Sequence, residues 1–267
     1  MSVAHLNVRS VASRENFYLL KERVTTNNSE SWLDRTVCDA DILILGYTTF
    51  RQDRGPYKRG GGVLVYVKDI YKACVIEKWS SVSESNFQQL WLLVQCKKFK
   101  SFLLFTVYRP PDVPIDFLEN LSETFVDSLL HGSNVIILGD LNCNLIGSDP
   151  DGHALSDFCS TFGLSQLVKT ATRVTEKSKS LIDVALTTNE NIIYACDVMQ
   201  SAISDHSLVS LTLKLKTPRP RISFVTTRSY KNYDHDTFIE DLANVPFHIV
   251  NLFDDLDDQV HAFNCLF

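Results

Sequence analysis

The sequence predicts an α/β protein built from two packed β-sheets with helices on the outside. Short apolar runs separated by turn residues recur along the first 216 residues, as is typical of many short strands. Only a few stretches between them have helical spacing. Several runs, such as residues 135–138, are apolar without alternation, which indicates strands buried on both faces. Two stacked sheets covered by helices would bury such strands completely.

The expected elements follow from the spacing of apolar residues. We expect strands at residues 3–7, 62–67, 73–76, 89–95, 102–108, 135–138, 181–186, 192–198 and 208–215. Helices are expected at 13–24, 115–130 and 154–162, where apolar residues recur every three or four positions. The run Gly60-Gly61-Gly62 precedes a strand and lacks a following Gly-Lys-Ser/Thr, so it indicates a hairpin connection and not a phosphate-binding loop.

Composition excludes several classes of protein. The 267 residues are 45% apolar, which fits a globular core, and the seven cysteines are odd in number and never form C-x-x-C. Neither a disulfide framework nor a zinc ribbon is therefore indicated. No apolar run approaches the roughly 20 residues that cross a bilayer, so we expect no membrane partner. The net charge of −6 argues weakly against nucleic-acid binding by bulk electrostatics.

A domain boundary is expected at Thr217, where TPRPR places two prolines and two arginines after the last strand. We therefore predict one domain at residues 1–216. Residues 217–267 form a partly helical segment with helical patches at 237–242 and 254–267 and no obvious core of its own.

The strongest candidate site is VIILGDLNCN, a buried strand that ends by presenting Asp140 and Asn142 at its C-terminal edge. Ligands bind at such edges, and these side chains offer an anionic oxygen and a neutral amide. Taken alone, Asp-x-Asn after a strand is more often an Asx turn.

A second signal is Ser204-Asp205-His206, which comes just before the last strand, together with Asp183 inside an apolar strand. A buried carboxylate needs a partner, and His206 is the natural one for Asp183. Without other motifs, a structural Asp-His pair is an equally good interpretation.

Weaker signals stand at other strand ends. Asn7 ends the first strand, Glu30 lies in the polar stretch NNSESWLD, and Tyr108-Arg109 precedes two prolines that end a strand. Arg109 could reach a phosphate, although each of these residues is also an ordinary strand terminator or surface residue.

Read in order, HLNVRS, SESWLD, GYTTFRQDRG, RGGGVLVYVKD, VYRPP, ILGDLN, SLIDVAL and SDHSLV resemble the endonuclease domain of non-LTR retrotransposons, in the endonuclease/exonuclease/phosphatase family. The resemblance covers about residues 3–216. It implies a DNase I-like four-layer sandwich of two β-sheets between helices. It also implies that the tail joins a reverse transcriptase in a full-length element, and that the protein acts in the nucleus.

The resemblance further implies an activity and its residues. The implied activity is Mg²⁺-dependent nicking of DNA, with Mn²⁺ as a substitute metal and no small-molecule cofactor, leaving a 3′-hydroxyl. Asn7, Glu30 and Asp205 would contact the metal, while the implied catalytic residues are Asp140, Asn142, Tyr108, Asp183 and His206. DNA contacts are implied for Arg9, Arg109, Arg173 and Ser204.

One departure from the family pattern concerns Glu30. The spacing from Asn7 is about half a dozen residues short, because an apolar strand normally separates the first helix from the Glu motif. Either residues 23–29 unwind to bridge the gap or the sheet loses a strand. Both outcomes would misplace Glu30, so we expect weak or no activity unless this segment rearranges. We reject DADILIL as the missing strand, because GYTTFRQDRG would then lose its match.

Two alternatives to nicking stay open. The same fold and motifs serve phosphatases of small phosphate esters, and the chain could be a catalytically impaired fragment of a retroelement.

Overall fold

The computed structural model describes residues 1–8, 10, 26–29, 31–54, 60–84, 86–96, 100–131, 134–201, 204–215, 231 and 233–266. The chain divides into two compact units, Met1–Pro220 and Arg221–Phe267, close to the boundary expected at Thr217. The expected helix at 13–24 lies outside the described residues.

One sheet of the first unit has six strands in the order β14-β15-β1-β2-β4-β3. Their bounds are Ile193–Met199 (β14), Leu208–Leu213 (β15), Ser2–Asn7 (β1), Thr26–Ser29 (β2), Val63–Lys68 (β4) and Tyr47–Gln52 (β3). Strand β2 runs parallel to β1 and antiparallel to β4. Strands β3 and β4 pair antiparallel, which confirms that the glycine run lies in a hairpin connection.

The second sheet has seven strands, six of them in the order β10-β13-β9-β8-β7-β5, with β6 pairing β7. Their bounds are Ser165–Gln166 (β10), Asp183–Thr187 (β13), Asn134–Asp140 (β9), Phe102–Tyr108 (β8), Gln88–Gln95 (β7), Lys72–Val75 (β5) and Ser81–Val82 (β6). A separate small hairpin joins Arg173–Val174 (β11) to Lys179–Ser180 (β12).

The main core lies between the two sheets, because alternate residues of each strand point inward. Val65 of β4, Leu104 of β8, Ile136 of β9 and Leu211 of β15 belong to one buried cluster. The intervening residues of β8 and β9 point to the other face, where a second cluster forms. Both faces of these strands are therefore buried, which explains their apolar runs without alternation.

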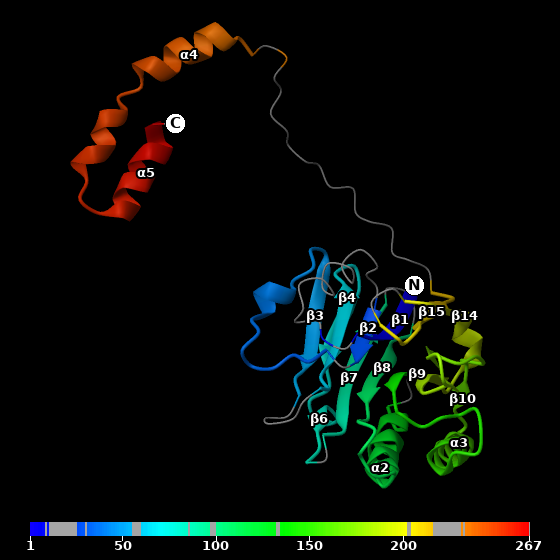
Figure 1. Cartoon of the computed structure of the whole chain (residues 1–267). Coiled ribbons are helices and arrows are strands. Elements are labelled where there is room, and N and C mark those ends of the chain that lie inside the picture. The colour runs from blue at the N-terminus through cyan, green and yellow to red at the C-terminus, as the bar shows by residue number, and fades with distance from the viewer. Residues whose placement is uncertain are drawn as a thin grey trace. The chain divides into compact units, whose positions relative to one another are not determined.

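Helices α2 (Phe117–Leu129) and α3 (Pro150–Phe162) cover the outer face of the second sheet, and Figure 1 shows them beside one another. Phe125 of α2 and Phe158 of α3 pack edge to face at 6.1 Å. On the outer face of the first sheet, the short 3₁₀ helix η1 (Asp39–Ile42) contributes Ile42 to a third cluster. The predicted class, an α/β protein of two packed sheets with helices outside, is confirmed.

The sequence analysis left open whether residues 23–29 bridge the shortened spacing before Glu30 or the first sheet loses a strand. The polar residues Thr26–Ser29 form β2 between β1 and β4, so the first sheet is continuous at this position. DADILIL contains the 3₁₀ helix η1, which agrees with its rejection as the missing strand.

The second unit contains α4 (His235–Asn244), the 3₁₀ helix η3 (Phe247–Leu252) and α5 (Leu256–Leu266). No described residue of these helices is buried. Among the described residues of the whole chain, no helix has the length and apolar character that a bilayer span requires.

Candidate active site

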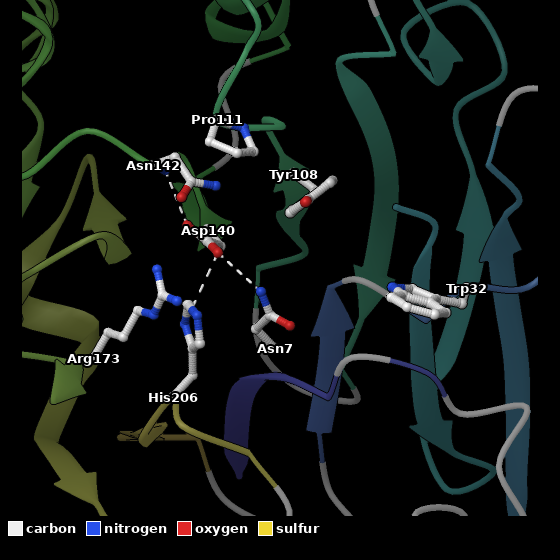
Figure 2. A pocket seen from close by; sticks show the side chains of 8 residues that line it. All are labelled: Asn7, Trp32, Tyr108, Pro111, Asp140, Asn142, Arg173 and His206. Atoms are coloured by element: carbon white, nitrogen blue, oxygen red, sulfur yellow. Dashed lines mark hydrogen bonds and ion pairs between the residues drawn. The ribbon is translucent and has the colours of Figure 1, made fainter. Parts of the chain in front are cut away.

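Ends of strands from both sheets meet at one pocket. Strand β1 ends at Asn7, β8 at Tyr108 and β9 at Asp140, while β13 begins at Asp183. Within the second sheet, Tyr108 and Asp183 lie on either side of Asp140 in the strand register. The pocket has a volume of about 520 Å³ and is lined by Asn7, Trp32, Tyr108, Pro111, Asp140, Asn142, Arg173 and His206 (Figure 2).

Asp140 is the buried acid of this pocket. Asn7 Nδ2 donates a hydrogen bond to its Oδ2 at 2.9 Å, which joins the two sheets at the site. The backbone N–H of Asn142 donates to its Oδ1, also at 2.9 Å. Burial and the neighbouring charge of Asp183 raise the pKa of Asp140 to about 7, although His206, Asn7 and Asn142 oppose this shift. Asp140 can therefore exchange a proton near neutral pH.

The pKa of Asp183 shifts in the opposite direction, because this carboxylate lies between two histidines. His206 Nδ1 lies 2.9 Å from Asp183 Oδ2, and His5 Nε2 lies 3.3 Å from Oδ1. Burial alone would raise the pKa of Asp183, but His206 and His5 together hold it below the usual 3.8. Burial lowers the pKa of His206, while the hydrogen bond and charge of Asp183 raise it more, so the net shift is upward. This pair favours an ionised Asp183 and a charged His206.

Two residues of this arrangement, Thr172 and His5, contact Asp183 in a way that the sequence analysis did not predict. The buried Thr172 accepts the backbone N–H of Asp183 at its Oγ1, at 3.1 Å, and its carbonyl accepts the N–H of Ser207 at 2.6 Å. His5 shares a face of β1 with Asn7, because the two are separated by one residue in a strand. That alternation was the available signal for His5, whereas the role of Thr172 depends on a loop contact.

Asn142 lies at the pocket with a left-handed backbone, φ 48°. Its Nδ2 donates to the carbonyl of Arg109 at 2.8 Å, so it links the ends of β9 and β8. The motif Asp-x-Asn thus forms an Asx-type turn and lines the pocket as well.

Arg109 does not lie where the sequence analysis placed it. Its side chain is 3% exposed, and its Nε donates to the carbonyl of Val113 at 2.8 Å. The guanidinium also pairs with Asp151 at the start of α3. The chain turns back after Pro110 and Pro111, which brings the carbonyl of Val113 to Arg109. The carbonyl of Leu141 accepts from Nη1 of Arg109 at 3.2 Å. The structure therefore gives Arg109 a role in fixing this loop instead of the expected contact with DNA.

The remaining predicted residues are distributed around the pocket. Tyr108 and Arg173 line it, and Arg173 Nε donates to Asp205 Oδ2 at 2.9 Å. Ser204 Oγ accepts the backbone N–H of His206 at 3.1 Å and so holds the turn that presents this histidine. Glu30 and Arg9 lie outside the described residues.

The donor set of the pocket fits a hard divalent cation. The carboxylate of Asp140 and the amide of Asn7 supply oxygens, the ligand atoms that Mg²⁺ prefers. Asp140, Asp183 and His206 have ligand atoms within 4.8 Å of one another, but both carboxylate oxygens of Asp183 already face histidines. Burying Asp140 beside Asp183 raises its pKa, and a nearby cation would relieve that cost.

Comparison with known proteins agrees with this geometry. The endonuclease-reverse transcriptase family matches the chain over residues 102–210, a segment that holds Asp140, Asp183 and His206. The resemblance predicted from the motifs is thereby confirmed. The matched segment lies within the first unit. No curated protein matches the chain.

Solved structures share the DNase I-like fold of the first unit. The endonuclease domain of TRAS1, a telomere-specific non-LTR retrotransposon, superposes with a TM-score of 0.61 at 17% identity, covering 80% of this chain and 99% of that one. The catalytic domain of APE2 from Xenopus laevis gives 0.62 at 18% identity, covering 83% and 94%. A mannosyl-6-phosphatase from Bacteroides thetaiotaomicron gives 0.56 at 17% identity, covering 80% and 99%.

Proposed function

We propose that the chain is a Mg²⁺-dependent endonuclease that nicks DNA and leaves a 3′-hydroxyl. The observation that carries the proposal is the pocket in which Asp140, Asn142 and the His206–Asp183 pair meet Asn7 of the other sheet. An acid with a pKa of about 7 beside a buried imidazole with a raised pKa suits the hydrolysis of a phosphodiester.

Asp140 is the residue that activates water in this proposal. A water oxygen attacks the phosphorus and passes its proton to the carboxylate of Asp140. The bond from phosphorus to the 3′ oxygen then breaks, and that oxygen takes a proton from solvent water and leaves as the 3′-hydroxyl. Asn7 and the backbone of Asn142 fix the Asp140 carboxylate through one hydrogen bond to each oxygen. Asn142 also helps to position the phosphate.

His206 is the counter-charge for the phosphate. Its Nδ1 is held by Asp183, so its other ring nitrogen is the one that can donate to a phosphoryl oxygen. A positive imidazolium there stabilises the charge that develops on these oxygens. Tyr108 contributes a further contact to the scissile phosphate.

The metal would be held by Asn7 and Glu30, with Asp205 as a second acidic contact. When bound, Mg²⁺, or Mn²⁺ in its place, would neutralise charge on the phosphoryl and leaving oxygens. In this proposal Glu30 directly follows β2, whose last residue Ser29 pairs with Asn7.

DNA is the proposed substrate because the TRAS1 domain is described as the endonuclease of a retrotransposon. Arg173 at the pocket rim, with Ser204 and Arg9, would contact the DNA backbone. In a full-length element the 3′-hydroxyl would prime a reverse transcriptase in the same chain. Both nicking and priming would take place in the nucleus.

The test determines which chemical group stands at the 3′ end of the nick. Purified chain is incubated with supercoiled plasmid and Mg²⁺, and the nicked circles are then offered to a DNA polymerase with labelled nucleotides. Immediate incorporation indicates a 3′-hydroxyl. Nicks that become extendable only after treatment with a 3′-phosphatase would contradict the proposal.

A second candidate is hydrolysis of small phosphate monoesters, which the fold shared with a mannosyl-6-phosphatase favours. Release of inorganic phosphate from a sugar phosphate, without plasmid nicking, would support it. The third alternative, an impaired fragment, predicts that Mg²⁺ raises the melting temperature while neither substrate is cleaved.

A further inference from the structure

Trp32 differs from the other two tryptophans of the chain. Trp79 and Trp91 are 5% and 0% exposed and belong to the core beneath α2 and α3, whereas Trp32 is 41% exposed. Trp32 also lines the pocket that contains Asp140 and His206. In Figure 2 the ring of Trp32 lies on the opposite side of Asp140 from Arg173. Tyr108 is drawn between Asp140 and Trp32.

The backbone holds Trp32 in an unfavourable conformation. Its φ of 56° is left-handed, a region that a bulky aromatic residue rarely adopts and that Gly or Asn adopts readily. The N–H of Trp32 donates to the carbonyl of Gly61 at 2.7 Å, and the N–H of Ser31 donates to Gly62 at 2.9 Å. Such strain persists where the surroundings fix it, and it is concentrated at functional sites.

The fold itself does not explain a tryptophan at this position. The flanking Ser31 and Leu33 are both fully buried, so they anchor the segment in the interior. Trp32 instead lines the pocket, is 41% exposed and belongs to none of the three buried clusters. A turn residue such as Asn would satisfy the backbone at lower cost.

We infer that Trp32 is a DNA-binding residue that stacks on a nucleobase or deoxyribose next to the scissile phosphate. The inference rests on the proposed function and extends it to the substrate class. An aromatic face stacks on any base, so it adds affinity without sequence preference. A small phosphate monoester reaches the catalytic groups without such a contact, so Trp32 would distinguish a polynucleotide from a small ester.

The first test uses tryptophan fluorescence of the full chain, because Trp32 is the exposed member of the three. A duplex oligonucleotide is titrated in EDTA, and its binding is followed in parallel by the anisotropy of a label on the DNA. We expect the DNA to quench the emission and to protect it from acrylamide, and we expect Trp32→Phe to lose both effects. Bound DNA with unchanged emission would overturn the inference, as would the absence of DNA binding.

The second test compares substrates. Trp32→Asn keeps the left-handed backbone and removes the ring, whereas Trp32→Phe keeps a smaller ring. We expect Trp32→Asn to weaken DNA affinity, and to raise the KM for nicking, by about 5- to 150-fold. Trp32→Phe should recover part of the loss, and hydrolysis of bis(p-nitrophenyl) phosphate should be unchanged. Tyr194→Asn, at a residue 75% exposed on β14, is the control.

Two results would overturn the inference in this second test. One is equal DNA affinity of Trp32→Asn and the unsubstituted chain. The other is an equal loss of activity on DNA and on the small diester, which would mean that the variant damages the catalytic groups. If the unsubstituted chain binds DNA but cleaves neither substrate, the proposed function fails, and the affinity comparison still decides the role of Trp32.

Discussion

At the scale of single residues, the site depends on two carboxylates that face one another across a strand pair. Asp140 and Asp183 are register partners of β9 and β13 and are both buried, yet their pKa values move in opposite directions. The difference arises because both histidines lie within 3.3 Å of Asp183, whereas His206 is 3.9 Å from Asp140, which receives its hydrogen bonds from neutral amides. Environments that separate two carboxylates in this way assign them different roles.

The first prediction concerns Asp183→Asn. The change leaves His206 and His5 buried without their anionic partner, so we expect the free energy of unfolding to fall by about 3–5 kcal/mol. Urea denaturation of both proteins at neutral pH measures the difference.

The pH dependence of that difference is a control on its cause. The raised pKa of His206 stabilises the fold fully below its usual 6.5, and this contribution is lost as pH rises through the raised value. The lowered pKa of Asp183 stabilises the fold above its usual 3.8, and this contribution is lost on acidification. The two proteins should differ most between these limits. An equal difference from pH 4 to pH 9 would contradict the ion pair.

The second prediction concerns Arg109. Arg109→Ala removes a buried cation from Asp151 and from several loop carbonyls, so we expect it to lower the free energy of unfolding by about 3–5 kcal/mol. Lys78→Ala, which removes an exposed partner of Asp127, should change it little. A stable Arg109→Ala variant with weakened DNA affinity would instead restore the role in DNA binding that the sequence suggested.

At the scale of elements, residues 31 and 32, shortly after the strand β2, are held by backbone hydrogen bonds. After β2, the backbone N–H groups of Ser31 and Trp32 donate to Gly62 and Gly61. The N–H of Gly62 in turn donates to the side chain of Gln88, which also binds Asn86. This buried network links the segment after β2 to β7 of the other sheet. Residues 31 and 32 are therefore linked to the second sheet through Gly62 and Gln88.

The third prediction tests this connection with matched glycines. Gly62 and Gly46 have φ values of 87° and 84°, but a Cβ at Gly62 would lie 2.4 Å from Ser31 Oγ, whereas one at Gly46 meets nothing within 4 Å. Gly46→Ala should cost about 1–2 kcal/mol for the left-handed backbone. Gly62→Ala should cost more and should also lower the nicking rate. Equal melting temperatures and rates for the two variants would contradict the account.

Elements with a clear apolar pattern were predictable, and those without one were not. The expected strand at 102–108 has the bounds of β8 itself, because all seven of its residues are buried. Strand β3 was missed, since it lies at the edge of its sheet and its residues YTTFRQ are mostly half-buried. Strand β2 was missed because TNNS carries no apolar signal.

The site was predictable only in part for a related reason. Asp140, Asn142, Asp183 and His206 follow or interrupt apolar strands, so their positions were visible in the sequence. Arg109 shows the limit, because only the turn after Pro111 decides whether its guanidinium meets loop carbonyls or solvent. Trp32 carried no signal, since its exposure follows from the contacts of its neighbours.

At the scale of the whole molecule, the two units differ in how they are stabilised. Every buried side chain among the described residues belongs to the first unit, up to Leu215. The N-terminal amine of Met1 donates to the carbonyls of Leu213 and Leu215, which ties the start of the chain to the end of β15.

The fourth prediction follows from this distribution. A chain that ends at Pro220 should keep the melting temperature and nicking rate of the full chain, because it retains the buried clusters and the pocket. Differential scanning calorimetry of both proteins measures this. A chain that ends before His206 is the control, since it lacks His206 and β15 and should not fold. A large loss of stability in the chain ending at Pro220 would show that the second unit supports the first.

The most direct test of the central claim is a plasmid nicking assay of the full chain in Mg²⁺ and in EDTA, with Asp140→Asn and His206→Gln. Asp69→Asn and His153→Gln, at exposed residues that do not line the pocket, serve as matched controls. We expect nicking that requires Mg²⁺, that falls by at least about 100-fold in each pocket variant, and that persists in both controls. Nicking that continues in EDTA or in Asp140→Asn, or no nicking by a folded chain, would contradict the account.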